Sequence, residues 1–593
     1  MSDDKDDKRF SKSTDNVDSS HIFIFPFKWG KTKNQGKNRI TNIETLQKKL
    51  KDLKYDNHSD SFLSFLTSLM KSSEWEKKEF NTSNKLDYNT YHYIYPFARD
   101  VVFDTADDDK KIPYHHLELK LCPKEYVIKV DEGQDDKTFK ETYSLEVDKI
   151  TLDIYDFEVG MLSFHLLNNG NKYSFDDVLN INFFGRRSFN PFFKPNKSVF
   201  DYGQKMTKLS EDYAIGSAED FTQVPRSISI EPRSISTEPS DDNVEANEES
   251  IKHNPPKYYD AITQLLGNQI KSHGLVHLFD DRMFVISWCH NQNIINKSSD
   301  SRNKLEYGSL FEYTFIDRNR GLSYINDGFA GDLIDKSYYT RWMPNKMDRA
   351  SNEEEGTFYG ISRYSFVCLA SEANYTQIHM RTMYWKMCKL VLLQKAGLLQ
   401  FNEKIGQVSL LEPSGRRLED ISEVYQEFIK FKNKIKFNRV TEQDQGHEIY
   451  KQMIAIQELD KDLEELNGEM GELYQFANLL SQKEESITNR RLTKIATIFL
   501  PATLITSLFG MNLKDGWNFE SLNKGADIFW PFWEALSIAF FATYVLYIFV
   551  IGKNDKYGLE YIPHIFKDKS YKAIFFLLLF LVSLCLLCYS LFQ

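Results

Sequence analysis

The chain is constrained most by one stretch, Arg490 to Leu513, which reads RRLTKIATIFLPATLITSLFGMNL. From Ile495 to Leu513 it carries no charged residue. As a helix these residues would span roughly 28 Å, close to the ~30 Å thickness of a bilayer's hydrocarbon core. Small or hydroxylated residues, with one leucine among them, recur at helical spacing along one side: Thr493, Ala496, Leu500, Thr503 and Ser507. The pattern predicts a membrane helix with one side on lipid and the other on helices or a narrow channel.

The predicted helix ends at Gly510-Met511-Asn512, and Pro501 lies nine residues before Gly510. With a short loop and a second apolar segment behind it, this arrangement resembles the signature of the CorA family of magnesium channels. The resemblance implies five copies around a pore, with a ring of Asn512 side chains holding a hydrated cation at the entrance. Mg²⁺ sheds water reluctantly, so an amide ring can select the ion without stripping its hydration shell. On the apolar pattern alone, a helix that only packs in a bundle stays an alternative.

Four residues fall on one face of a helical wheel and are similar in place to the family's pore-facing positions: Leu492, Ala496, Leu500 and Thr503. The resemblance implies a pore lined by these side chains and a selectivity filter at Gly510, Met511 and Asn512. Leu492 and Leu500 would form apolar constrictions that close by dewetting. We expect rotation or splaying of the helices to open them.

Further apolar segments follow the span at residues 490–512. Residues 513–528 form a loop, residues 529–551 a second predicted span, and residues 573–592 an uncharged segment long enough to be a third. The third segment departs from the usual CorA chain, which ends soon after its second helix. Lysine and arginine concentrate before the first span and between the second and third, so the N-terminal domain is predicted to be cytosolic and the loop external. We therefore expect a multi-pass protein in the bilayer of the cell (inner) membrane.

A helical stalk is predicted over residues 409–489. From Leu459 onward the apolar residues recur in alternating steps of four and three, the a/d seam of a coiled coil. We expect a single helix from about Gly446 to the end of the first span, roughly 95 Å long. The CorA resemblance implies such a stalk, which transmits the state of the cytosolic domain to the gate. It also implies that Asp460 and Asp462 hold regulatory Mg²⁺ between subunits, with a solvated stalk face as the alternative.

The remainder of the chain divides by composition. Residues 1–20 are acidic and Lys- and Ser-rich, which predicts a disordered tail. Residues 21–205 and 258–408 mix alternating apolar runs with helical patterns, which predicts two parts of a cytosolic α/β domain. Between them, residues 206–257 hold the tandem PRSISIE and PRSISTE and an acidic, Ser-rich stretch, which predicts a disordered insertion.

The expected fold class is therefore a multi-pass α-helical membrane protein with a large cytosolic α/β domain. Its long stalk helix is expected to be continuous with the first membrane helix. The CorA resemblance adds a funnel-shaped homopentamer.

Two aromatic settings in the soluble part hold candidate ligand contacts, Arg186 with Arg187 in FFGRRSFNPFF and Arg341 with Trp342 in TRWMPNK. An arginine beside aromatic rings can grip a phosphate or stack a base, but stacking on its own neighbours or packing of a loop is the competing interpretation. The net charge of −11 argues against general nucleic-acid affinity. The sequence contains no P-loop, Ser/His/Asp signature or HExxH motif, which disfavours an enzyme.

Two functions remain open. The first is a channel for Mg²⁺ or another divalent cation, with Mg²⁺ as the transported or the regulatory ion. The second is a CorA-like pore with a different role. The chain resembles the CorA-like membrane effectors of type III CRISPR systems in its length, its third apolar segment and its unusual soluble part. That resemblance implies antiviral defence by a nucleotide second messenger, such as an adenylate joined to S-adenosylmethionine, which binds the cytosolic domain and opens the pore.

Overall fold

The computed structural model describes residues 16–29, 65–66, 69, 74–78, 80–81, 83–103, 114–130, 141–155, 157–189, 225–231, 258–291, 305–317, 338–339, 357–371, 374–409 and 415–510. The chain divides into two compact units. The first comprises Met1–Leu411 and Ser422–Glu472, and the second comprises Glu412–Ile421 and Leu473–Gln593.

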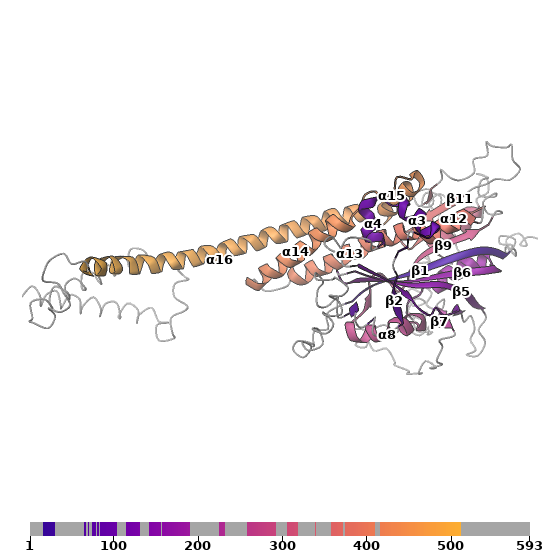
Figure 1. The fold of residues 1–593 in the computed structure, drawn as a ribbon, viewed down its shortest axis with the longest axis horizontal. Coiled ribbons are helices and arrows are strands. Elements are labelled where there is room, and N and C mark those ends of the chain that lie inside the picture. The colour runs from indigo at the N-terminus through magenta and orange to yellow at the C-terminus, as the bar shows by residue number, and fades with distance from the viewer. Residues whose placement is uncertain are drawn as a thin grey trace, which may run out of the picture. The chain divides into compact units, whose positions relative to one another are not determined.

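The first unit is built on a sheet of twelve described strands (Figure 1). Its main path runs β10-β11-β12-β9-β1-β6-β5-β3-β2, with β4 beside β5, β7 beside β4 and β8 beside β1. Among the described strand pairs only β9 and β12 run parallel. The strands are β1 (Asn16–Lys28), β2 (Trp75–Lys77), β3 (Tyr114–Leu119), β4 (Glu125–Val130), β5 (Glu141–Tyr155), β6 (Val159–Ser174), β7 (Pro225–Glu231), β8 (Val276–His277), β9 (Phe284–His290), β10 (Tyr338–Tyr339), β11 (Thr357–Ile361) and β12 (Ser365–Ala370).

Helices lie on both faces of this sheet. The described helices of the chain are α3 (Lys85–Tyr93), α4 (Pro96–Phe103), α5 (Phe175–Gly185), α8 (Asp260–His273), α10 (Leu305–Phe315), α12 (Asn374–His379), the π-helix η3 (Met380–Tyr384), α13 (Trp385–Ser409), α14 (Gly415–Ile435), α15 (Asp444–Ile456) and α16 (Leu459–Gly510). In Figure 1, α8 lies below the sheet and α13 above it. Because both faces are covered, the central strand β1 is almost continuously buried.

The two faces of the sheet differ in chemistry. On one face, Phe25, Leu152 and Phe164 belong to a large apolar cluster that also takes in Leu266 of α8. On the other face, the next residue along β5, Asp153, forms a salt bridge with Lys389 of α13. Period-two alternation thus sends apolar side chains toward α8 and buried polar ones toward α13.

The large α/β domain predicted from the sequence is confirmed. Strands from 21–205 and from 258–408 share one sheet, because β1 pairs with both β6 and β9. The structure differs from the expected disorder in two places. β1 already begins at Asn16, and β7 lies within 206–257 and pairs antiparallel with β4. Ile228 and Ile230 of the first PRSISIE copy are buried there, so an apolar period of two is enough to add a strand.

The expected single helix from about Gly446 is interrupted. α15 ends at Ile456 and α16 begins at Leu459, and Glu458 between them has a left-handed backbone with φ 56°. The interruption is held by tertiary contacts, since Nε2 of Gln457 donates to the carbonyl oxygen of Arg363 at 3.1 Å. From Leu459 the helix is continuous to Gly510, as expected for the junction of stalk and first span.

Within the part of the chain that the structure describes, no helix meets the length and apolarity that a membrane crossing requires. The predicted loop 513–528 and the predicted spans 529–551 and 573–592 lie outside the described residues.

Candidate functional site

The four predicted pore residues lie on the last part of α16, and all four are exposed in the single chain. Leu492 and Leu500 expose 58% and 62% of their surface, and their neighbours Ile495 and Phe499 expose 54% and 63%. Contiguous apolar surface of this kind is typical of a segment that a partner or a lipid covers. The described residues of the chain leave this part of α16 uncovered.

Polar groups on this part of α16 are oriented by the helix itself. The Thr503 hydroxyl donates to the carbonyl oxygen of Phe499 at 2.7 Å, and Thr493 donates to that of Asn489 at 2.8 Å. Such bonds place the hydroxyl oxygens along the helix surface. Gly510 is the last residue of α16, whereas Met511 and Asn512 of the predicted filter lie outside the described residues.

Asp460 and Asp462 lie in the first turn of α16, where carboxylates are favoured by the helix dipole. Asp460 accepts from Nζ of Lys436 at 2.5 Å and is 72% exposed. Burial and the nearby Glu458 raise the pKa of Asp462. Among the described residues no group of three or more His, Cys, Asp or Glu is placed to hold a metal ion.

Arg186 and Arg187 follow α5 and are buried, with 3% and 7% of their surface exposed. Arg187 forms an ion pair with Asp281. Arg282, which sequence reasoning did not select, binds Asp280 through Nη2 at 2.5 Å and Nε at 2.8 Å. The structure thus brings together three arginines and two aspartates. Arg341 and Trp342 lie outside the described residues.

The electrostatics of this cluster are dominated by Arg186. Burial, followed by the positive charges of Arg282 and Arg187, lowers the pKa of Arg186 to about 9. Asp280 and Asp281 oppose this effect without cancelling it. The Arg186 environment is therefore both desolvated and positively charged.

A second polar cluster, which the sequence did not predict as a site, lies between the sheet and α13. Oδ1 of Asp153 accepts from Nζ of Lys389 at 2.8 Å, Nδ1 of His116 at 2.8 Å and the hydroxyl of Tyr114 at 2.6 Å. Burial alone would raise the pKa of Asp153, but Lys389 and His116 hold it well below its usual range. In the sequence, the one indication of this cluster is the charged residue Lys389 within a largely apolar segment that is predicted to be helical.

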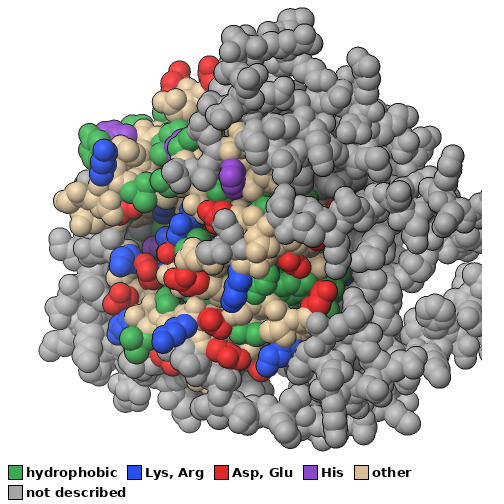
Figure 2. All heavy atoms as spheres, turned by 90° about the vertical axis from the view of Figure 1, so that its right-hand side faces the viewer, with side chains coloured by type: hydrophobic (Ala, Val, Ile, Leu, Met, Phe, Trp, Pro, Cys, Tyr) green, Lys and Arg blue, Asp and Glu red, His purple; other side chains and the backbone are tan. Residues whose placement is uncertain are grey.

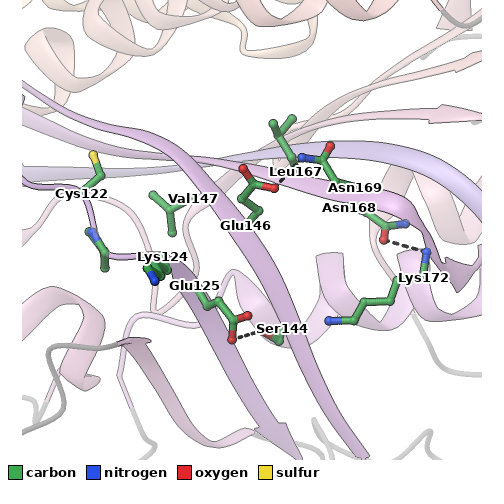
Figure 3. A pocket seen from close by; sticks show the side chains of 11 residues that line it. Cys122, Lys124, Glu125, Ser144, Glu146, Val147, Leu167, Asn168, Asn169 and Lys172 are labelled. Carbon is green, nitrogen blue, oxygen red and sulfur yellow. Dashed lines mark hydrogen bonds between the residues drawn. The ribbon is translucent and has the colours of Figure 1, made fainter.

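A pocket of about 500 Å³ lies among β4, β5 and β6 (Figure 3). Its lining mixes lysines, glutamates and amides. Glu125 already accepts from the Ser144 hydroxyl at 2.6 Å, and Glu146 from Nδ2 of Asn169 at 2.5 Å. Because these groups satisfy one another, the pocket has hydrogen-bonding capacity but favours no single ligand charge.

The surface carries both signs of charge. Figure 2 shows Lys and Arg side chains interspersed with Asp and Glu on the face that it presents.

Comparison with known families finds a match over one part of the chain. Residues 401–553 match the family model described as CorA-like Mg2+ transporter protein. Over these residues the chain is similar to that family. The resemblance drawn from Gly510-Met511-Asn512 is thereby confirmed, and the match contains α14, α15, α16 and every predicted pore residue. No curated protein matches the chain.

The CorA-like match starts within α13, near its end, so most of the twelve-stranded sheet and its covering helices precede it. The residues of the two buried clusters, around Arg186 and around Asp153, therefore all precede the segment that the family model matches.

Proposed function

We propose that the protein is a membrane channel for divalent cations and that Mg²⁺ is the ion it transports. The matched family is one of Mg²⁺ transporters, which supports divalent-cation transport in general and a membrane location. The proposed path is lined by Leu492, Ala496, Leu500 and Thr503 and ends at the filter Gly510-Met511-Asn512. By the family resemblance, five copies surround it.

The observation that carries this proposal is the apolar exposure of α16 inside the CorA-like segment. Leu492 and Leu500 lie two helical turns apart and expose more than half of their surface. Other copies of the same helix, with lipid on the outer side, would cover such side chains. Rings of leucine facing each other then form a dewetted constriction that bars hydrated ions.

Control of this gate is proposed to come from the N-terminal domain. α16 starts inside the first unit, where Leu459, Leu466 and Met470 are buried with 0%, 4% and 0% exposure. The same helix continues to Gly510 without interruption. Movement of its buried start would therefore change the orientation of the pore residues. In this proposal the domain is cytosolic, and residues 529–551 and 573–592 supply further spans.

Ion flux tests the proposal. The purified full chain is reconstituted in liposomes that contain a Mg²⁺-sensitive dye, and Mg²⁺ is added outside. We expect gradient-driven influx that Asn512→Ala strongly reduces, because the amide ring is lost. Asn489→Ala, at an exposed asparagine of α16, serves as the matched control and should keep the influx. Absence of influx through folded wild-type protein would refute the proposal.

The second function, a nucleotide-controlled defence effector with the same pore, is favoured by one observation. Most of the α/β domain lies outside the CorA-like match. In this alternative, that domain receives a stimulus other than Mg²⁺. The same liposomes separate the two functions. Influx without added nucleotide indicates an ion-supply channel, whereas influx that starts only on adding an adenylate indicates the effector.

A further inference from the structure

The Arg186 guanidinium is buried with few partners. Its Nη2 donates to the carbonyl oxygen of Ile316 at 3.1 Å. Within the described part of the chain, Nε and Nη1 have no hydrogen-bond partner. Buried charged donors without acceptors are strongly destabilising. Nε and Nη1 of Arg186 therefore have the capacity to donate to acceptors of a ligand.

The neighbouring charges do not neutralise Arg186. Asp281 is paired with Arg187 and Asp280 with Arg282, so each carboxylate already has an arginine partner. Nε of Arg187 is also buried and, as far as the described residues extend, has no partner. The cluster therefore keeps one excess positive charge and unused N–H donors on two side chains.

Tyr364 places one aromatic ring beside this cluster. The ring centroid lies 5.7 Å from Cζ of Arg186 and 5.3 Å from Cζ of Arg282. The residue itself is 42% exposed. In the proposal below, rotation of this partly exposed side chain gives a ligand from solution access to the guanidinium groups.

We propose that Arg186, Arg187 and Arg282 bind the phosphoryl group of a small-molecule ligand. Phosphoryl oxygens are acceptors only, carry negative charge and form strong charge-assisted bonds with guanidinium groups. Phosphoryl oxygens would accept hydrogen bonds from Nε and Nη1 of Arg186. Their negative charge would also balance the excess positive charge of the cluster. A free phosphate and a nucleotide share this chemistry.

The site is connected to the start of α16 through one turn. Tyr364 lies between β11 and β12, and the carbonyl oxygens of Ser362 and Arg363 accept from Nε2 of Gln457 at 3.4 and 3.1 Å. Arg363 also forms an ion pair with Glu458, the residue that separates α15 from α16. A ligand that displaces Tyr364 thus acts on the α15–α16 junction. This regulatory step rests on the proposed function, in which α16 leads to the gate.

Binding is tested by thermal unfolding of the detergent-solubilised full chain at constant ionic strength. Inorganic phosphate and AMP are titrated separately, with chloride as the reference anion. We expect a saturable rise in Tm. Equal apparent affinity for both identifies the phosphoryl group as the whole ligand, and tighter binding of AMP identifies a nucleotide. No saturable rise with either probe overturns the proposal.

The Arg186→Met variant separates a ligand site from a structural role. It keeps the length of the side chain and removes the unpaired charge, so we expect an unchanged or higher Tm without ligand and no rise with phosphate or AMP. Arg381→Met, which breaks the ion pair with Asp148 at 2.8 Å, is the matched control and should keep the rise. An equal rise in wild type and Arg186→Met contradicts the proposal.

If Arg186→Met fails to fold, Arg186→Lys keeps the charge but loses the guanidinium donors. We expect it to bind the better probe at least about tenfold more weakly, which corresponds to about 1.4 kcal/mol. Unchanged affinity contradicts the assignment. Coupling is tested by Arg363→Gln, which should retain binding but lose ligand control of Mg²⁺ influx. Because binding is read without ion flux, failure of the channel proposal and failure of this site remain distinguishable.

Discussion

The interior of the α/β domain buries charged side chains, whereas the outer part of α16 exposes apolar ones. Both regions depart from the usual distribution, in which charged side chains are exposed and apolar ones are buried. Inside the domain, Asp153 and Lys389 are charged groups with 0% and 2% exposure. On α16, Leu492 and Leu500 are apolar and exposed by more than half. The buried pair is held within the chain by hydrogen bonds to Oδ1 of Asp153. The exposed leucines are not covered by the described residues, so we expect lipid and other copies of the chain to complete them.

This difference indicates which interactions stabilise each region. The domain has its own core and its own polar partners, so changes there should alter unfolding. In the proposed function the outer part of α16 is covered by other copies and lipid, so changes there should alter ion flux and assembly but leave the fold of the domain intact.

The largest effect is expected from breaking the buried ion pair. Lys389→Met should destabilise the protein by about 3–5 kcal/mol, because Asp153 is left as a buried charge with too little compensation. Urea unfolding followed by tryptophan fluorescence measures this. The double variant Lys389→Met with Asp153→Leu should recover most of the loss. A single variant as stable as wild type would show that the pair is not ionised.

Stability should also fall at mildly acidic pH because of buried histidine. His21 is fully buried, its Nδ1 donates to Asn182 at 2.7 Å, and burial lowers its pKa to about 4. Between an unfolded value of about 6.5 and the folded value, only the unfolded state takes up the proton, so stability is lost as pH falls, by up to about 1.4 kcal/mol per pH unit.

Unfolding measured from pH 7 to pH 4 tests this slope. His21→Gln should reduce the slope without removing it, because burial also lowers the pKa values of His116 and His165. The exposed His92→Gln should leave the slope as in wild type. Equal slopes in wild type and His21→Gln would exclude His21 as the source.

A smaller free-energy change at the proposed gate should still be visible as flux. Leu500→Ser makes the constriction wettable, and lowering its barrier by about 1.4 kcal/mol raises ion leak about tenfold. The control is Leu479→Ser, which changes an equally exposed leucine on α16, at 64%. It should not leak. Unchanged leak in Leu500→Ser would place the gate elsewhere.

The smallest effect is expected at the start of α16. Lys436→Ala removes the pair with the exposed Asp460 and should change stability by no more than about 0.5 kcal/mol, because water screens such pairs. Mg²⁺-dependent stability measured in parallel reports on Asp460 as a regulatory ligand. A loss comparable to that of Lys389→Met would show that this region shares the behaviour of the domain interior.

The sequence predicts those elements whose signal is local. The apolar periods of β1 and β5 and the run of α16 to Gly510 are visible in the residues themselves. The interruption before α16 is not, because Gln457 is held by Ser362, a residue 95 positions away in the chain.

Contacts between residues far apart in the sequence also limit prediction of the sites. The aromatic setting of Arg186 and Arg187 marked them as candidates, but Arg282 joins them only through the fold. Asp153 and Lys389 are 236 positions apart, so their pairing has no local pattern. The Gly-Met-Asn signature could be recognised because three adjacent residues carry it.

Cysteine cross-linking in native membranes tests the central claim that other copies of the chain complete the outer part of α16. Leu500→Cys and the matched control Leu466→Cys, at a buried position with 4% exposure, are oxidised and resolved by size against wild type. We predict a product of two chains for Leu500→Cys alone, because each engineered cysteine can pair with only one other. Only monomers of Leu500→Cys, in membranes that contain the protein, would contradict a pore built from α16.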